Sequence, residues 1–107
     1  MSGPQVTTVL AEDRMRELGF TDHRETHWYL CRRVGDATTL NVSISKANGS
    51  WTEDVLDEYF GQPAYYGRMR SPYREQVIAK VNAEIELLRD AGLDVRIDHR
   101  LYGVEEN

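Results

Sequence analysis

The amino-acid sequence predicts an α+β domain, a two-layer sandwich in which helices cover one face of a three-stranded, mainly antiparallel sheet. Residues 9–18 and 73–91 repeat apolar side chains every three or four positions, which is the period of a helix. Residues 38–45 and 95–102 instead alternate apolar and polar side chains, which indicates strands that are buried on one face only. Helices should pack on that face, and the expected order is helix, strand, strand, short helix, long helix, strand.

The first helix should begin after Thr8 and end before Gly19. Threonine oxygens cap helix N-termini, and glycine adopts the left-handed conformation that ends many helices. In such an ending, Phe20 would pack back on Met15.

The first two strands, residues 27–34 and 38–45, should form a hairpin whose turn leaves two registers open. A two-residue loop at Gly35 and Asp36 would turn Trp28 outward. A three-residue loop that also includes Ala37 would bury Trp28 opposite Ile44 and Leu30 opposite Val42. We favour this register because it buries the larger apolar set, at roughly 1.5–3 kcal/mol per side chain.

Two more helices and one more strand should follow. A serine and a glutamate with capping-box spacing predict a short helix from Trp51 to Phe60. Ser71 and Pro72 suit the start of a long helix that ends near Ala91, and Val95 to Tyr102 should form the third strand. The apolar face of the long helix should consist of Val77, Ile78, Val81, Ile85 and Leu88.

Length and composition favour one cytoplasmic domain. A chain of 107 residues can bury one core, so we expect a single domain over 1–107 with flexible ends at 1–6 and 104–107. Its one cysteine, Cys31, excludes an intrachain disulfide framework. The first residues lack the basic and apolar pattern of a signal peptide, and no segment is apolar long enough to cross a bilayer.

No motif of known chemistry predicts an enzyme, and we expect no catalytic residue, cofactor or metal. His23, Glu25, His27 and Cys31 would share one side of an extended strand, but they spread too far along it to hold one ion. His99 has apolar neighbours at alternate positions, which favours a place at the edge of the core.

Residues 62–74 are the best candidate for a binding site, because tyrosines and arginines gather there without any Asp or Glu. These residue types dominate binding hot spots. In the alternative interpretation, the tyrosines cover the core and the arginines pair with Asp54, Asp57 and Glu58. The candidate partner-binding residues are Tyr65, Tyr66, Arg68, Arg70, Tyr73 and Arg74.

The open face of the predicted sheet is a second candidate contact surface, through which the chain could form a homodimer. In the favoured register this face carries polar and aromatic side chains. Its candidate contact residues are His27, Tyr29, Arg33, Arg96, Arg100 and Tyr102.

Two segments carry a resemblance to a known group of proteins. Residues 27–46 (HWYLCRRVGDATTLNVSISK) and 57–69 (DEYFGQPAYYGRM) resemble small proteins encoded by actinobacteriophages of the mycobacteriophage kind. That group has no assigned activity. The resemblance covers the middle of the chain and implies a protein that acts inside a bacterial cell on a host or phage component.

Together these features predict a small, non-enzymatic module that binds an acidic partner protein, as an adaptor, an inhibitor or a modulator of a host protein. The alternative is a nucleic-acid-binding accessory protein, whose tyrosines would stack on bases while its arginines contact phosphates. The formal net charge of −5 favours the protein partner.

Overall fold

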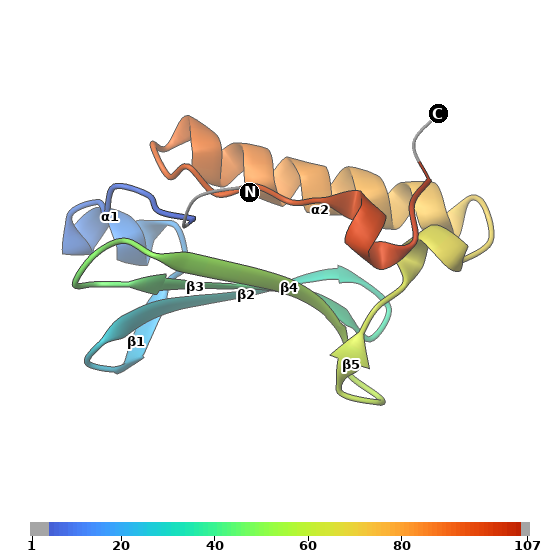
Figure 1. Ribbon diagram of the computed structural model, residues 1–107, viewed down its shortest axis with the longest axis horizontal. Coiled ribbons are helices and arrows are strands. Elements are labelled where there is room, and N and C mark those ends of the chain that lie inside the picture. Colours follow the sequence, from blue (N-terminus) through green and yellow to red (C-terminus); the bar gives the residue numbers. More distant parts are fainter. Residues whose placement is uncertain (1–4, 106–107) are drawn as a thin grey trace.

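Five antiparallel strands follow one another as a meander, so that each strand pairs with the next one along the chain (Figure 1). The computed structural model describes residues 5–105. The strands are β1 (Thr21–Arg24), β2 (His27–Gly35), β3 (Thr38–Ser45), β4 (Trp51–Asp57) and β5 (Gln62–Pro63). The helices are α1 (Glu12–Glu17) and α2 (Tyr73–Asp90), with 3₁₀ turns η1 (Tyr66–Arg68) and η2 (His99–Tyr102). Both helices lie on the same side of the sheet (Figure 1).

This topology corrects the predicted three-stranded sheet and its order of elements. The segment expected as a short helix is β4, whose Trp51 and Val55 are buried while Thr52 and Asp54 between them are exposed. The segment expected as a third strand lies outside the sheet and ends in η2. β1 and β5 were not predicted. The turn at Gly49 reverses the chain after β3, so residues 51–57 pair with β3 as a strand.

The predicted register of the first hairpin is confirmed. Trp28 lies opposite Ile44 and Leu30 lies opposite Val42, so the alternative with Trp28 facing outward is wrong. Ala37 has a φ of 52°, the left-handed conformation that closes a three-residue hairpin loop with a bulge. The register therefore follows the burial of the larger side chains.

The long helix and the glycine ending of the first helix are also confirmed. α2 ends one residue short of Ala91, and its predicted apolar face is buried except for the half-buried Ile78. At the end of α1, Gly19 has a φ of 102° and the amide of Phe20 donates to the carbonyl of Met15 at 3.1 Å. α1 itself is shorter than predicted and begins at Glu12, without a side-chain cap.

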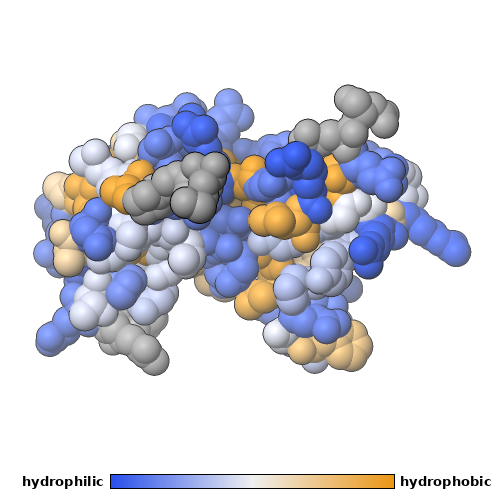
Figure 2. Space-filling view, viewed as in Figure 1, coloured by the Kyte–Doolittle hydropathy of each residue, from blue (hydrophilic) through white to orange (hydrophobic). Residues whose placement is uncertain are grey.

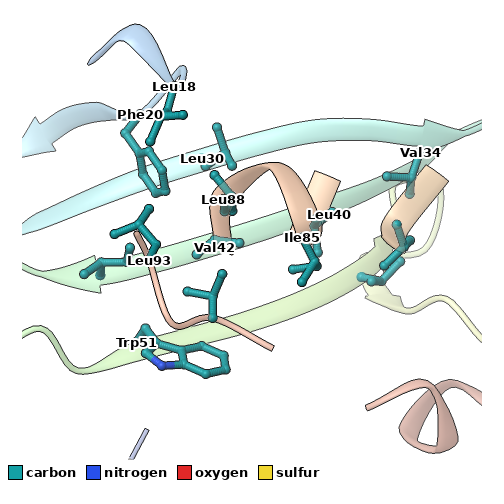
Figure 3. Packing of buried hydrophobic residues seen from close by; sticks show 14 of the residues in the cluster. Leu18, Phe20, Leu30, Val34, Leu40, Val42, Trp51, Ile85, Leu88 and Leu93 are labelled. Carbon is teal, nitrogen blue, oxygen red and sulfur yellow. The ribbon is translucent and has the colours of Figure 1, made fainter. Parts of the chain in front are cut away.

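The core lies between the sheet and α2. Figure 3 shows Ile85 and Leu88 of α2 beside Leu40 and Val42 of β3, with Trp51 of β4 on the neighbouring strand. Within the described residues, no helix combines the length and the apolar character that crossing a lipid bilayer requires.

The chain after α2 completes the helical layer above β4. The amide of Asp94 donates to the hydroxyl of Thr7 at 2.7 Å, and Val95 is buried. Further along, the buried Tyr102 accepts a hydrogen bond from the amide of Val55 on β4 at 3.1 Å. These contacts place η2 beside η1, at the end of the molecule where α2 begins (Figure 1).

The described parts of the two predicted flexible ends are held by contacts. The amide of Trp51 donates to the carbonyl of Gln5, and Val6 forms a bridge with Ser50. At the other end, the amide of Val104 donates to the carbonyl of His99. Residues 1–4 and 106–107, which complete the predicted flexible ends, lie outside the described residues.

Candidate functional site: an arginine groove at the start of α2

The site is built on a close backbone crossing between η1 and η2. A Cβ atom at Gly67 would lie 2.2 Å from the carbonyl carbon of Gly103, a separation that no side chain tolerates. Gly103 has a φ of 84°, a left-handed conformation that glycine adopts without steric cost. Glycine at both positions lets the two turns touch, so the residues that flank them are held in fixed relative positions.

Buried aromatic side chains pack beneath this crossing, on its core side. Tyr66 is fully buried, and its ring stacks on that of Tyr102 with the centroids 5.3 Å apart. Burial raises the pKa of the Tyr66 hydroxyl, which therefore stays protonated and donates to Nδ1 of His99. The other ring nitrogen of His99 donates to Oδ1 of Asn82 on α2 at 2.7 Å. The crossing is thus tied to the long helix.

A groove of about 710 Å³ runs between the two turns and the first two turns of α2. We call it the arginine groove, since three arginines belong to its lining. At this end of the molecule Figure 2 shows hydrophilic side chains with apolar ones between them. The lining residues are Gly67, Arg68, Arg74, Ile78, Arg100, Gly103, Val104 and Glu105.

Arg68 is the guanidinium in the groove that remains available to an acidic ligand. Its Cζ lies 4.9 Å from the ring centroid of Tyr65, and its stem passes over Gly103. No carboxylate among residues 5–105 lies within ion-pair distance of it. Contacts on both sides limit its rotamers, which lowers the entropy cost of binding.

The other two arginines of the groove are held by neighbouring carboxylates. Arg74 Nη2 lies 2.8 Å from Oε1 of Glu75, and bonds from Ser71 and then Arg74 lower the pKa of Glu75 to about 2. Arg100 binds Asp98 through two nitrogens, and these bonds lower the pKa of the Asp98 carboxyl. Both guanidinium groups are therefore oriented and partly neutralised.

The six residues predicted in the binding loop do not form one exposed surface. Tyr65, Arg68 and Arg70 are exposed, and Tyr65 has 44% of its surface accessible. Tyr73 is half-buried and its hydroxyl accepts a hydrogen bond from the amide of Asp36, so it fastens α2 to the β2–β3 turn. Tyr66 belongs to the core. The predicted pairing of the loop arginines with Asp54, Asp57 and Glu58 is absent among the ion pairs of the described residues; Arg33 is the partner of Glu58.

Only three of the six residues predicted on the open sheet face lie on that face. His27, Tyr29 and Arg33 lie on that face, because they alternate with the buried side chains of β2. Arg96, Arg100 and Tyr102 were placed there through the predicted third strand, which the structure does not contain. Arg96 and Arg100 are exposed in the helical layer, and Tyr102 is buried in it.

Two exposed aromatic residues were missed as contact candidates. Tyr59 and Phe60 form the tip of the β4–β5 hairpin and have 78% and 75% of their surface accessible. They lie at the end of the segment that the sequence predicts as a short helix, Trp51 to Phe60. The signal that could have found them is Gly61, whose φ of 62° is the left-handed conformation that many hairpin loops require.

Among residues 5–105, no group of three or more His, Cys, Asp or Glu side chains is arranged to hold a metal ion. The side chain of His23, one of the ligands considered from sequence, lies outside the described part of the chain. Comparison with protein-family models, curated proteins and solved structures finds no match to this chain.

Proposed function

We propose that this protein is a non-enzymatic binding module that holds an acidic segment of a partner protein in the arginine groove. The observation that carries the proposal is Arg68, an exposed guanidinium held between Tyr65 and Gly103 without a carboxylate partner among the described residues. Guanidinium forks bind carboxylates through two hydrogen bonds, and an arginine fixed in advance loses little freedom when it does so.

The lining of the groove specifies more than negative charge. Ile78 and Val104 contribute apolar surface beside the guanidinium groups. A segment in which an acidic side chain stands next to an apolar one would fill the groove and satisfy Arg68 together. Such mixed contacts, with an arginine near the centre, are typical of binding hot spots.

Nucleic acid is the second candidate, favoured by one observation: exposed Tyr65 beside Arg68 could stack on a base while the guanidinium contacts a phosphate. Glu75, Asp98 and Glu105 at or beside the groove oppose a phosphate backbone. The formal net charge of −5 opposes it further, so the protein partner is the better-supported ligand.

The test is an affinity capture with three forms of the protein, each with and without nuclease. Wild type should retain a protein in near-stoichiometric amount, Arg68→Glu should lose it, and Arg14→Glu should retain it. Arg14 is an exposed residue of α1, and α1 lies at the opposite end of the molecule from η1, η2 and the start of α2 (Figure 1), so this control makes the same change of charge elsewhere on the surface. Equal capture by Arg68→Glu contradicts the groove as the site, and loss of capture after nuclease assigns it to nucleic acid.

A further inference from the structure

The tip of the β4–β5 hairpin presents two aromatic side chains to solvent on a well-held turn. The amide of Tyr59 donates to Oδ1 of Asp57 at 2.9 Å, and the amide of Gly61 donates to the carbonyl of Asp57 at 2.8 Å. Glu58 is tied to the neighbouring hairpin, since its amide donates to the carbonyl of Ala37 at 2.8 Å. These hydrogen bonds therefore hold the backbone of the tip in one shape.

The aromatic pair at this tip contributes little to folding. About three quarters of the surface of each residue is accessible, at 78% for Tyr59 and 75% for Phe60. Figure 2 shows pale orange, apolar atoms among hydrophilic ones at the lower right, in the region where Figure 1 places β5 and its turn. Polar residues would form the same turn and would expose less apolar surface, whereas rigid exposed aromatics are the residues that anchor interfaces.

The charge beside the tip is opposite to that of the arginine groove. Asp57 and Glu58 precede the aromatic pair, and the Asp57 carboxylate is already engaged within the turn. Glu58 makes only a long, exposed contact of 3.9 Å with Arg33, which contributes little. The tip thus offers a carboxylate next to apolar rings, the combination that the groove is suited to bind.

We infer that two copies of this chain form a two-fold dimer in which the hairpin tip of each copy enters the arginine groove of the other. The inference rests on the proposed function, because it names the occupant of the same groove. The β4–β5 hairpin lies at the same end of the molecule as η1, η2 and the start of α2, which supply lining residues of the groove (Figure 1). A two-fold axis through that end forms both contacts at once and leaves no unpaired tip or groove.

The size of the two surfaces fits this pairing. A groove of about 710 Å³ is within the usual range of ligand clefts. Since an aromatic side chain buries roughly 150–250 Å², two tips and the two grooves that receive them would bury on the order of 1,000–1,500 Å². That total reaches the lower end of specific interfaces, so the dimer should be of micromolar strength and weakened by salt.

Sedimentation velocity over a concentration series tests the pairing. Wild type should dimerise, and Phe60→Ser, Glu58→Arg and Arg68→Glu should each weaken dimerisation at least about tenfold. The double variant Glu58→Arg with Arg68→Glu should recover it, because the two charges are exchanged across the interface. Leu87→Gln, which removes an exposed leucine of α2, is the matched control and should behave as wild type. Unfolding curves confirm that each variant is folded.

A wild-type chain that stays monomeric at about 200 μM, well above the Kd expected for such an interface, overturns the inference. So does a dimer that survives either the tip or the groove substitution, or a double variant that fails to recover. A labelled peptide of residues 54–62 and an unrelated acidic peptide containing leucine, both titrated with the Phe60→Ser variant, separate the two proposals. If the unrelated peptide binds while the wild-type chain stays monomeric, the proposed function stands and the dimer falls; if neither peptide binds, both fall.

Discussion

Glu53 is a partly buried carboxylate between β4 and η2. Its negative charge should lower the stability of the folded protein at neutral pH. Its Oε2 accepts a hydrogen bond from the hydroxyl of Tyr102 at 3.1 Å. Partial burial, with smaller contributions from Asp54 and Asp98, raises the pKa of Glu53 from 4.5 to about 6. The hydrogen bond from Tyr102 opposes this rise but does not cancel it. Replacing Glu53 with Gln keeps an acceptor for Tyr102 and removes the charge.

The sign of the effect follows from which state holds the proton. Between pH 4.5 and 6 the folded protein binds more protons at Glu53 than the unfolded chain, so stability falls as pH rises through this range. A tenfold change in proton affinity equals about 1.4 kcal/mol. The rise to about 6 would therefore cost about 2 kcal/mol for a fully buried group, and solvent screening of this half-exposed carboxylate reduces the cost to about 1 kcal/mol.

Glu53→Gln should therefore stabilise the protein by about 1 kcal/mol at pH 8 and change little at pH 4. For a domain of this size the gain corresponds to roughly 4–8 °C in Tm. Thermal unfolding followed by circular dichroism at pH 4, 6 and 8 measures it, with Glu86→Gln on the exposed face of α2 as control. An equal gain at pH 4 and pH 8, or a loss at pH 8, would refute the reasoning.

Three further predictions concern the core, the crossing and the register. Tyr66→Ala should lower the free energy of unfolding by about 3–5 kcal/mol in urea titrations, because it empties a fully buried site; a loss below about 1 kcal/mol would place the residue at the surface. Gly67→Ala should cost at least about 2 kcal/mol, because its methyl group would meet the backbone of Gly103; a melting curve like that of wild type would contradict the close crossing. In a Trp51→Phe variant, the fluorescence of Trp28 should be quenched weakly by iodide, because this side chain is only 3% exposed; strong quenching would favour the other register.

The error at β4 shows where two sequence patterns coincide. Ser50 and Glu53 have the spacing of a capping box, and Trp51 and Val55 are four residues apart, which fits one face of a helix. Four is also an even number, so the same pair shares one face of a strand, as the structure shows. The deciding signal was the turn at Asn48 and Gly49, which is a strong local indication of a hairpin.

The error at the last segment has a different physical cause. Residues 95–102 alternate in hydropathy, but alternation does not show whether a sheet edge is available to pair with. The segment lies in the helical layer, where Val95 and Tyr102 are buried. Asp98 then accepts a hydrogen bond from the amide of Arg100 and turns the chain into η2. An aspartate that can cap a turn was the local signal against a continuous strand.

The sequence does not show how the side chains of the candidate stretch, residues 62–74, are oriented. Adjacent Tyr65 and Tyr66 look equivalent in the sequence, yet one is exposed beside Arg68 and the other stacks on Tyr102 in the core. The contact between Gly67 and a turn more than thirty residues later decides this, and no local pattern contains it.

The contact between η1 and η2 supports the fold and also positions the arginine groove, because Gly67 and Gly103 belong to both. Substitutions at Tyr66 or Gly67 should reduce stability and binding together, since both depend on the contact between η1 and η2. Substitution of Arg68 should reduce binding alone, because its guanidinium lies on the surface of a structure that the aromatic side chains already hold. A variant set that failed to separate in this way would show that the groove is not a preformed site but a surface that is ordered only when a ligand binds.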